Sequence, residues 1–132
     1  MNAFLIELTN KPGELARVAE AIAAAGVNVT AISGSTCGEG GSVAFMTADD
    51  AATRSVLQNA VIPFREVEAI ETPLPHQPGT LAKAARRLAD AGVNIEAILA
   101  TGMDGGNVTV AFVTGDPARA RETLAQAGTT QG

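Results

Sequence analysis

The sequence predicts an α+β fold of two ferredoxin-like β-α-β-β-α-β repeats, each with an antiparallel sheet that carries its helices on one face. Two observations support this prediction. The segment PGELARVAEAIAAAGVNVTAI at 12–32 recurs 66 positions later as PGTLAKAARRLADAGVNIEAI at 78–98. Around both copies, apolar residues at strand spacing and at helix spacing follow one another in the same order. A repeat of this length defines the architecture before any single element is assigned.

The length of the chain agrees with two small domains. Its 132 residues suffice for one ordinary domain or for two very small ones. Because one repeat takes up half of the chain, we expect a first domain at 1–66 and a second at 67–132.

The first repeat begins with a strand, Ala3–Leu8, in which alternate residues share a face. A helix follows Pro12, because proline suits the first helical turn. It ends before Gly26, because glycine suits a left-handed C-cap. The apolar stripe of this helix comprises Leu15, Val18, Ala19 and Ile22.

The remainder of the first repeat is a hairpin and a second helix. A strand over Val27–Ser33 leads into a glycine-rich hairpin turn at 34–41 and a strand over Ser42–Thr47. Asp49 or Asp50 caps the second helix, and a further strand begins at Val61. The residues of the second helix expected to face inward are Thr53, Val56, Leu57 and Ala60.

The second repeat has the same order of elements. Its hairpin turn is expected at 102–106 and its third strand at 108–113, and Asp116 followed by Pro117 starts a last helix that ends at Gly128. From the hairpin onward the offset between the repeats is 67, so we expect one added residue in the second hairpin. The apolar stripe of its first helix comprises Leu81, Ala84, Ala85 and Leu88, and Gly92 is the expected C-cap.

The junction between the repeats and the end of the chain are both irregular. The segment FREVEAIE at 64–71 contains no turn residue, so it is expected to form one long strand that serves both sheets. Only four residues follow Gly128, so the second repeat is expected to lack a final strand of its own.

Composition and charge exclude several function classes. The net charge of −5 and the absence of a basic run argue against a nucleic-acid partner. With one histidine, one cysteine, no tyrosine and no tryptophan, we find no catalytic group, metal site or cofactor motif and expect no enzyme activity. A lone cysteine fits a reducing cytoplasm, and the uncharged segment 21–38 is too polar for a membrane span.

Two motifs resemble the ACT family of regulatory domains. Asn-Lys-Pro-Gly at 10–13, followed at helical distance by Gly-Val-Asn at 26–28, resembles one ACT domain, and 76–79 with 92–94 resembles a second. The whole chain is similar to small stand-alone tandem ACT proteins. The resemblance implies a free amino acid as ligand, bound at an interface between two such domains.

The resemblance also implies which residues hold the ligand. Asn10 and Asn28 match the two asparagines that serine-sensing dehydrogenases of the family use, and His76 with Asn94 takes their place in the second repeat. Leu8 and Leu74 stand where those dehydrogenases have a histidine, which weakens the case for serine. The complete predicted site comprises Asn10, Lys11, Pro12, Gly13, Glu14, Leu15, Asn28, Val29, His76, Gln77, Pro78, Gly79, Thr80, Leu81, Asn94 and Ile95.

The chemistry of these residues suits a zwitterion. Free N–H groups at a helix N-terminus attract a carboxylate, and Gly13 and Gly79 leave room for a ligand to approach the backbone. An asparagine amide can meet either charge of an amino acid. Two simpler interpretations stay open: Asn10 as a helix cap, and Asn28 as a turn residue.

The predicted function is a non-catalytic, cytoplasmic sensor that binds a free amino acid and signals to a partner. The alternative is an interaction module, or a regulatory subunit of an enzyme of amino-acid metabolism, that binds no ligand itself. We also expect close packing of the repeats or a homodimer, the homodimer being favoured. The strands at 43–46 and 110–113 are apolar on both faces, and the second repeat leaves a bare edge.

Overall fold

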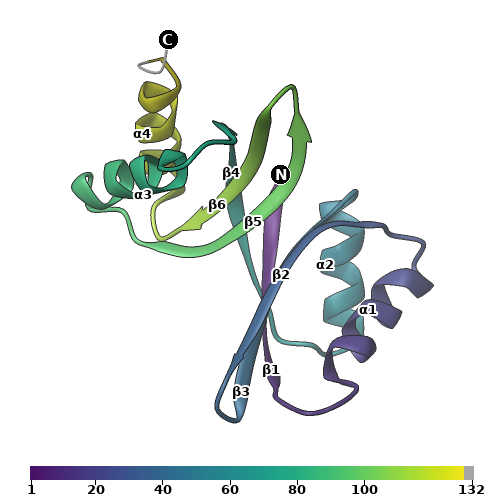
Figure 1. The fold of residues 1–132 in the computed structure, drawn as a ribbon. Helices are drawn as coiled ribbons and strands as arrows, with labels where there is room; N and C mark the ends of the chain where they lie inside the picture. The colour runs from purple at the N-terminus through teal and green to yellow at the C-terminus, as the bar shows by residue number, and fades with distance from the viewer. Residues whose placement is uncertain (130–132) are drawn as a thin grey trace. The chain divides into compact units, whose positions relative to one another are not determined.

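The computed structural model describes residues 1–129, which form four helices and six strands (Figure 1). The chain divides into two compact units, residues 1–67 and the residues from Glu68 onward. Each unit has the element order of one predicted repeat, so the predicted fold class is confirmed.

The first unit consists of a sheet with two helices on one face (Figure 1). Strand β3 lies between β1 and β2 and pairs antiparallel with both. The elements are β1 (Asn2–Thr9), α1 (Glu14–Ala24), β2 (Val29–Cys37), β3 (Gly40–Thr47) and α2 (Asp50–Asn59).

Cross-strand rows in this sheet define which side chains face the helices. Phe4, Phe45 and Ile32 form one row, and the next row on the same face toward the hairpin tip is Ile6, Val43 and Gly34. Phe4 and Phe45 stack with ring centroids 5.8 Å apart. The core of the unit comprises Phe4, Ile6, Val18, Ile22, Val43, Phe45, Leu57 and Ile62.

The second unit repeats this plan. Strand β6 lies between β4 and β5, again antiparallel to both, and α3 and α4 lie beside each other. Its core comprises Ile70, Leu74, Ala84, Leu88, Val93, Val110, Phe112, Ala120 and Leu124. The elements are β4 (Arg65–Pro75), α3 (Thr80–Asp90), β5 (Ile95–Asp104), β6 (Asn107–Thr114) and α4 (Pro117–Thr129).

The predicted long strand at the junction is confirmed. Strand β4 runs without a break from Arg65 to Pro75, across the boundary between the two units. Within residues 1–129 no strand follows α4, as expected for the second repeat. That helix reaches Thr129, one residue beyond its predicted end at Gly128.

The predicted glycine and aspartate caps are confirmed, but Pro12 and Pro78 lie before the N-cap residues Gly13 and Gly79 and not in the first helical turn. Gly26 and Gly92 follow the first helix of each repeat with φ angles of 74° and 76°. The Asp49 carboxylate accepts a hydrogen bond from the backbone N–H of Ala52, 3.0 Å away. Asp116 caps α4 in the same way. These contacts satisfy N–H groups that the first helical turn leaves without a partner.

The expectation that a strand begins at Val61 is wrong. Val61 has a φ angle of 55° and is 84% exposed, and its N–H donates to the backbone oxygen of Gln58. It therefore ends α2 as a left-handed residue, a conformation that a β-branched side chain rarely adopts. The strand begins four positions later, at Arg65.

The apolar stripes of the helices are shorter than predicted. Leu15 and Leu81 lie in the first turns of α1 and α3 and are 49% and 48% exposed, because the cores begin one turn later, at Val18 and Ala84. Ala19 and Ala60 are also exposed, and Ala60 lies beyond the last residue of α2.

The glycine-rich segment after Ser33 is mainly strand rather than turn. Strand β2 continues to Cys37 and β3 begins at Gly40, so only Gly38 and Glu39 form the turn. The glycines belong to the ladder: a Cβ atom on Gly41 would lie 3.1 Å from the backbone oxygen of Ser35. Glycine therefore permits close pairing at a position where another residue would crowd its neighbours.

The added residue of the second repeat lies inside a strand, not at the hairpin tip. Both turns have two residues, because Cys37 pairs with Gly40 and Asp104 pairs with Asn107. The pairing of β5 shifts between Ala100 and Gly102, which makes Thr101 the extra residue of a β-bulge.

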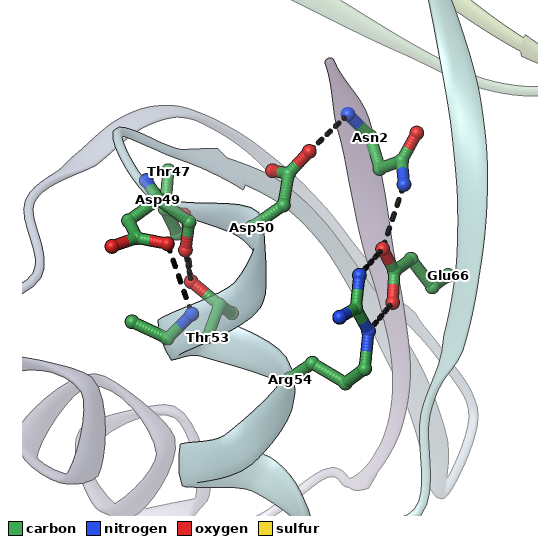
Figure 2. Close-up of polar contacts among 8 residues, drawn as sticks. Asn2, Thr47, Asp49, Asp50, Thr53, Arg54 and Glu66 are labelled. Carbon is green, nitrogen blue, oxygen red and sulfur yellow. Dashed lines mark hydrogen bonds and ion pairs between the residues drawn. The ribbon is translucent and has the colours of Figure 1, made fainter.

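A polar network anchors β4 within the first unit (Figure 2). Arg54 of α2 donates to both carboxylate oxygens of Glu66 at 2.6 and 2.7 Å, and the amide of Asn2 donates to the same carboxylate. These hydrogen bonds, first of all the one from Arg54, hold the pKa of the Glu66 carboxyl below its usual range. The backbone N–H of Asn2 donates to Asp50 at 3.0 Å, so α2 binds the first residue of β1 as well.

Candidate functional site

A pocket of about 500 Å³ opens in the first unit beside the start of α1. One wall is the loop between β1 and α1 with the first helical turn, and the floor is formed by paired residues of β2 and β3. Its size falls within the range of small-molecule sites. The lining residues are Leu8, Thr9, Asn10, Lys11, Glu14, Leu15, Ile32, Gly34, Ser35, Thr36, Gly41, Ser42 and Val43.

The N-terminus of α1 has no capping side chain. Gly13 occupies the N-cap position with a φ angle of 89°, and no side chain caps the turn. Its carbonyl accepts the first intrahelical bond, from the N–H of Arg17 at 3.0 Å. Space is open where a Cβ atom on Gly13 would point. The first turn therefore offers N–H groups and partial positive charge beside the pocket.

Asn10 joins the loop to the tip of the hairpin. Its side-chain nitrogen donates to the backbone oxygen of Gly38 at 3.0 Å, and its backbone N–H donates to Glu39 at 2.8 Å. The interpretation of Asn10 as a helix cap is therefore wrong, since its amide binds the hairpin instead. The side-chain oxygen of Asn10 remains an acceptor on a residue that lines the pocket.

Charged groups of both signs stand at the loop side of the pocket. The Glu14 carboxylate lies 3.8 Å from the guanidinium of Arg17, one turn further along α1, and is the more buried of the two side chains. Lys11 is an exposed residue of the same lining. The pocket therefore has a polar part at the loop and an apolar part at the floor.

Asn28 and Val29 lie at the other end of β2. Asn28 is exposed, its backbone oxygen accepts from the N–H of Ala48, and neither residue belongs to the pocket lining. Ten positions of extended chain separate Asn28 from Gly38, the partner of Asn10, which corresponds to about 30 Å. Asn10 and Asn28 of one repeat therefore do not share this pocket.

The predicted site residues of the second repeat have a parallel arrangement. The N–H of His76 donates to Gly106 at the hairpin tip, as Asn10 does to Glu39, and Gly79 has a φ angle of 92°. Pro78 and Gln77 complete the exposed loop, and Leu81 lies half exposed on α3. Asn94 and Ile95 are at the far end of β5, where the backbone oxygen of Asn94 accepts from Gly115.

One contact differs between the two loops. Thr80 replaces Glu14, and its hydroxyl donates back to the loop, 2.8 Å from the carbonyl oxygen of Pro75. Gln77 replaces Lys11. The loop of the second repeat is thus closed on itself by a neutral side chain and carries neither charge.

The floor of the pocket was not predicted from the sequence. The sequence places Gly34, Thr36 and Gly41 in a turn and predicts Ile32 and Val43 only as strand residues. The feature that could have predicted the floor is a pair of glycines opposite apolar residues of the neighbouring strands. Recognising it requires the register of the hairpin. That register became known only from the structure.

Cys37 is an exposed free thiol at the end of β2. Among residues 1–129, histidine, cysteine, aspartate and glutamate side chains form no cluster of three or more that could hold a metal ion. None of the helices in that range is both long enough and apolar enough to cross a membrane.

Comparison with protein families assigns both repeats. The family model described as ACT domain matches residues 3–58 and again residues 70–127. The chain belongs to the ACT domain family. No functionally curated protein matches the chain.

Several solved structures share this tandem ACT fold. A protein from Bacteroides thetaiotaomicron has a TM-score of 0.79 at 22% identity, with 96% of this chain and 88% of the other covered. The ligand-free regulatory subunit of aspartate kinase from Thermus thermophilus has a TM-score of 0.60 at 24% identity, covering 96% and 90%. The corresponding subunit from Thermus flavus has a TM-score of 0.62 at 22% identity with the same coverage.

Proposed function

We propose that this chain is a non-catalytic regulatory module that binds a free α-amino acid and passes that signal to a partner protein. The observation that carries the proposal is the pocket between the β1–α1 loop and the β2–β3 hairpin, in a chain of the ACT family. ACT domains are regulatory modules, and two of the similar structures are regulatory subunits of aspartate kinase.

The polar part of the pocket matches the two charges of an amino acid. The N–H groups of the first turn of α1 and the ammonium of Lys11 suit the ligand carboxylate. The Glu14 carboxylate and the free oxygen of Asn10 suit the ligand ammonium. Each charged group of the ligand therefore meets a group of opposite polarity, and no proton or electron has to be transferred.

The asparagines of the Gly-Val-Asn motif have a separate place in this proposal. Asn28 lies outside the pocket of its own repeat, so it contributes to binding if a second copy of the chain brings it there. We propose the homodimer as the assembly that would do so.

Binding also supplies a route for the signal. A ligand in the pocket would touch the loop, the first turn of α1 and the hairpin, and Asn10 already joins the loop to the hairpin through Gly38 and Glu39. Bound ligand would restrict their relative motion, and a partner that recognises the restricted form would bind more tightly.

A thermal-shift screen against the twenty proteinogenic amino acids tests the proposal. A ligand at 100 times its Kd adds about 2.7 kcal/mol to the free energy of unfolding, which raises Tm measurably. Calorimetry then gives the Kd of each hit. If no amino acid binds at millimolar concentration, the sensor function is wrong. A regulatory subunit or interaction module without its own ligand is then the better description.

A further inference from the structure

The two repeats differ at the floor of the pocket, in rows of side chains that can be matched one to one. On the face of the sheet that bears the helices, the row of the first repeat nearest the hairpin tip is Leu8, Gly41 and Thr36. The same row in the second repeat is Leu74, Val108 and Met103. The central position of the row therefore carries no side chain in one repeat and a valine in the other.

The next row on this face also has a glycine in the first repeat, at its edge-strand position. Ile6, Val43 and Gly34 of the first repeat correspond to Thr72, Val110 and Ala100 of the second. Both glycines of the first repeat lie on the face of the sheet that bears the helices, because Val43 beside Gly34 belongs to the core on that face. Two adjacent side chains are thus missing from the floor.

Packing around these positions follows the difference. Val108 packs against the core of the second repeat, and Leu74 in its row is 4% exposed. Leu8, which faces Gly41 instead, is only half-buried and lines the pocket. The pocket of the first repeat therefore forms a hollow over Gly34 and Gly41, and the second repeat has Ala100 and Val108 at these two positions.

The walls of the hollow have a defined chemistry. Leu8, Leu15, Ile32 and Val43 surround the two glycines with aliphatic groups, and the charged groups stand at the loop side. Leu15 and Ile32 are about half exposed although both are large and apolar. An aliphatic side chain placed between them would remove this surface from water, which favours binding.

We propose that amino-acid binding is confined to the first repeat and that the ligand carries an aliphatic side chain, which lies on the floor formed by Gly34 and Gly41. This inference rests on the proposed amino-acid binding. The second repeat, with Val108 on its floor and Thr80 closing its loop, has a structural role. Glu14 and Lys11 are replaced by neutral residues in the second repeat. The charged groups that suit an amino acid and the floor that suits its side chain therefore lie in the same repeat.

Calorimetry of the full chain with L-leucine tests the inference. We expect one leucine per chain, and weaker binding of alanine, serine, lysine and glutamate. Gly41→Val copies the second repeat and should weaken leucine binding by about ten-fold or more, because the added side chain occupies the hollow. Val108→Gly is the matched control, and leucine affinity should not change.

A second pair of variants does not depend on how the sheet tolerates Gly41→Val. Leu15→Ser removes an aliphatic wall at a position that is already half exposed, and Leu81→Ser makes the same change at the equivalent position of the second repeat. Leucine affinity should fall in the first variant and stay constant in the second.

The outcomes separate the inference from the function it rests on. Two leucines per chain, a loss of binding in Val108→Gly or Leu81→Ser, or tighter binding of a charged amino acid would each overturn the inference while amino-acid binding stands. No binding by any amino acid would instead remove the proposed function itself.

Discussion

At the scale of single residues, the same side-chain type has different roles according to what lies opposite. Asn10 joins a loop to the tip of the β2–β3 hairpin, whereas Asn28 is exposed at the other end of β2. Glu66 accepts from both Arg54 and Asn2. Glu14, which has one long contact to Arg17, is left available to a ligand.

The substitution Asn10→Ala is expected to weaken amino-acid binding by about 1–3 kcal/mol, the cost of leaving a polar partner unpaired. Titration calorimetry measures the change. Asn28→Ala serves as the companion variant: a similar loss there would mean that a second copy of the chain reaches the pocket. Unchanged affinity in Asn10→Ala would show that Asn10 does not bind the ligand and that its side chain serves only to bond Gly38.

The Glu66 carboxylate predicts a dependence of stability on pH. Because its pKa in the folded state is lowered, its contribution is present above the pKa of the unfolded chain and is lost as pH falls through the folded value. Glu66→Gln should therefore lower Tm at neutral pH, and the difference from the unmodified chain should shrink in acid. Thermal melts across the acidic range measure this, and a difference independent of pH would contradict it.

At the scale of elements, glycines determine where helices end and where strands approach closely. Gly26 and Gly92 end the first helix of each repeat in the left-handed region. Gly34 and Gly41 let β2 and β3 pair closely, because a Cβ atom there would lie 3.3 and 3.1 Å from a backbone oxygen of the neighbouring strand. The bulge at Thr101 then lets the second hairpin accommodate an extra residue while its turn keeps two residues. The two hairpins thus differ inside their paired strands and not in the length of their turns.

Replacing a helix-terminating glycine should destabilise the fold. Gly26→Ala forces a side chain into the left-handed conformation, which costs about 1–2 kcal/mol. Chemical denaturation measures the loss. Gly40→Ala is the control, because Gly40 has no positive φ and open space around its Cβ direction. Equal stability of Gly26→Ala and the unmodified chain would show that the α1 terminus rearranges without cost.

At the scale of the whole molecule, the prediction of a homodimer now rests on strand edges. Ala44, Met46, Ala111 and Val113 are buried within a single chain, so these positions give no argument for a second copy. Strands β2 and β5 are edge strands, and most of β2 is exposed. An edge of unpaired backbone groups invites pairing with another chain.

We expect sedimentation velocity over a wide dilution series to show a homodimer. Its dissociation on dilution should be accompanied by weaker amino-acid binding if Asn28 of the second copy contributes to the pocket. A chain that remains monomeric at the highest concentration would refute the homodimer. The proposed binding in the pocket of the first repeat would not be affected, because its lining residues belong to one chain.

The sequence by itself determined the repeats, their element order, the helix caps and the loops before α1 and α3, because these depend on local spacing and on residues with special backbone preferences. The pocket required the tertiary structure. Its floor depends on which residues of β1, β2 and β3 lie opposite one another, and one-residue differences in register exchange the two faces of a strand. The helix periodicity assigns Leu15 to the apolar face of α1, but it does not show whether the sheet covers that residue. In the structure Leu15 is about half exposed and lines the pocket together with Gly41.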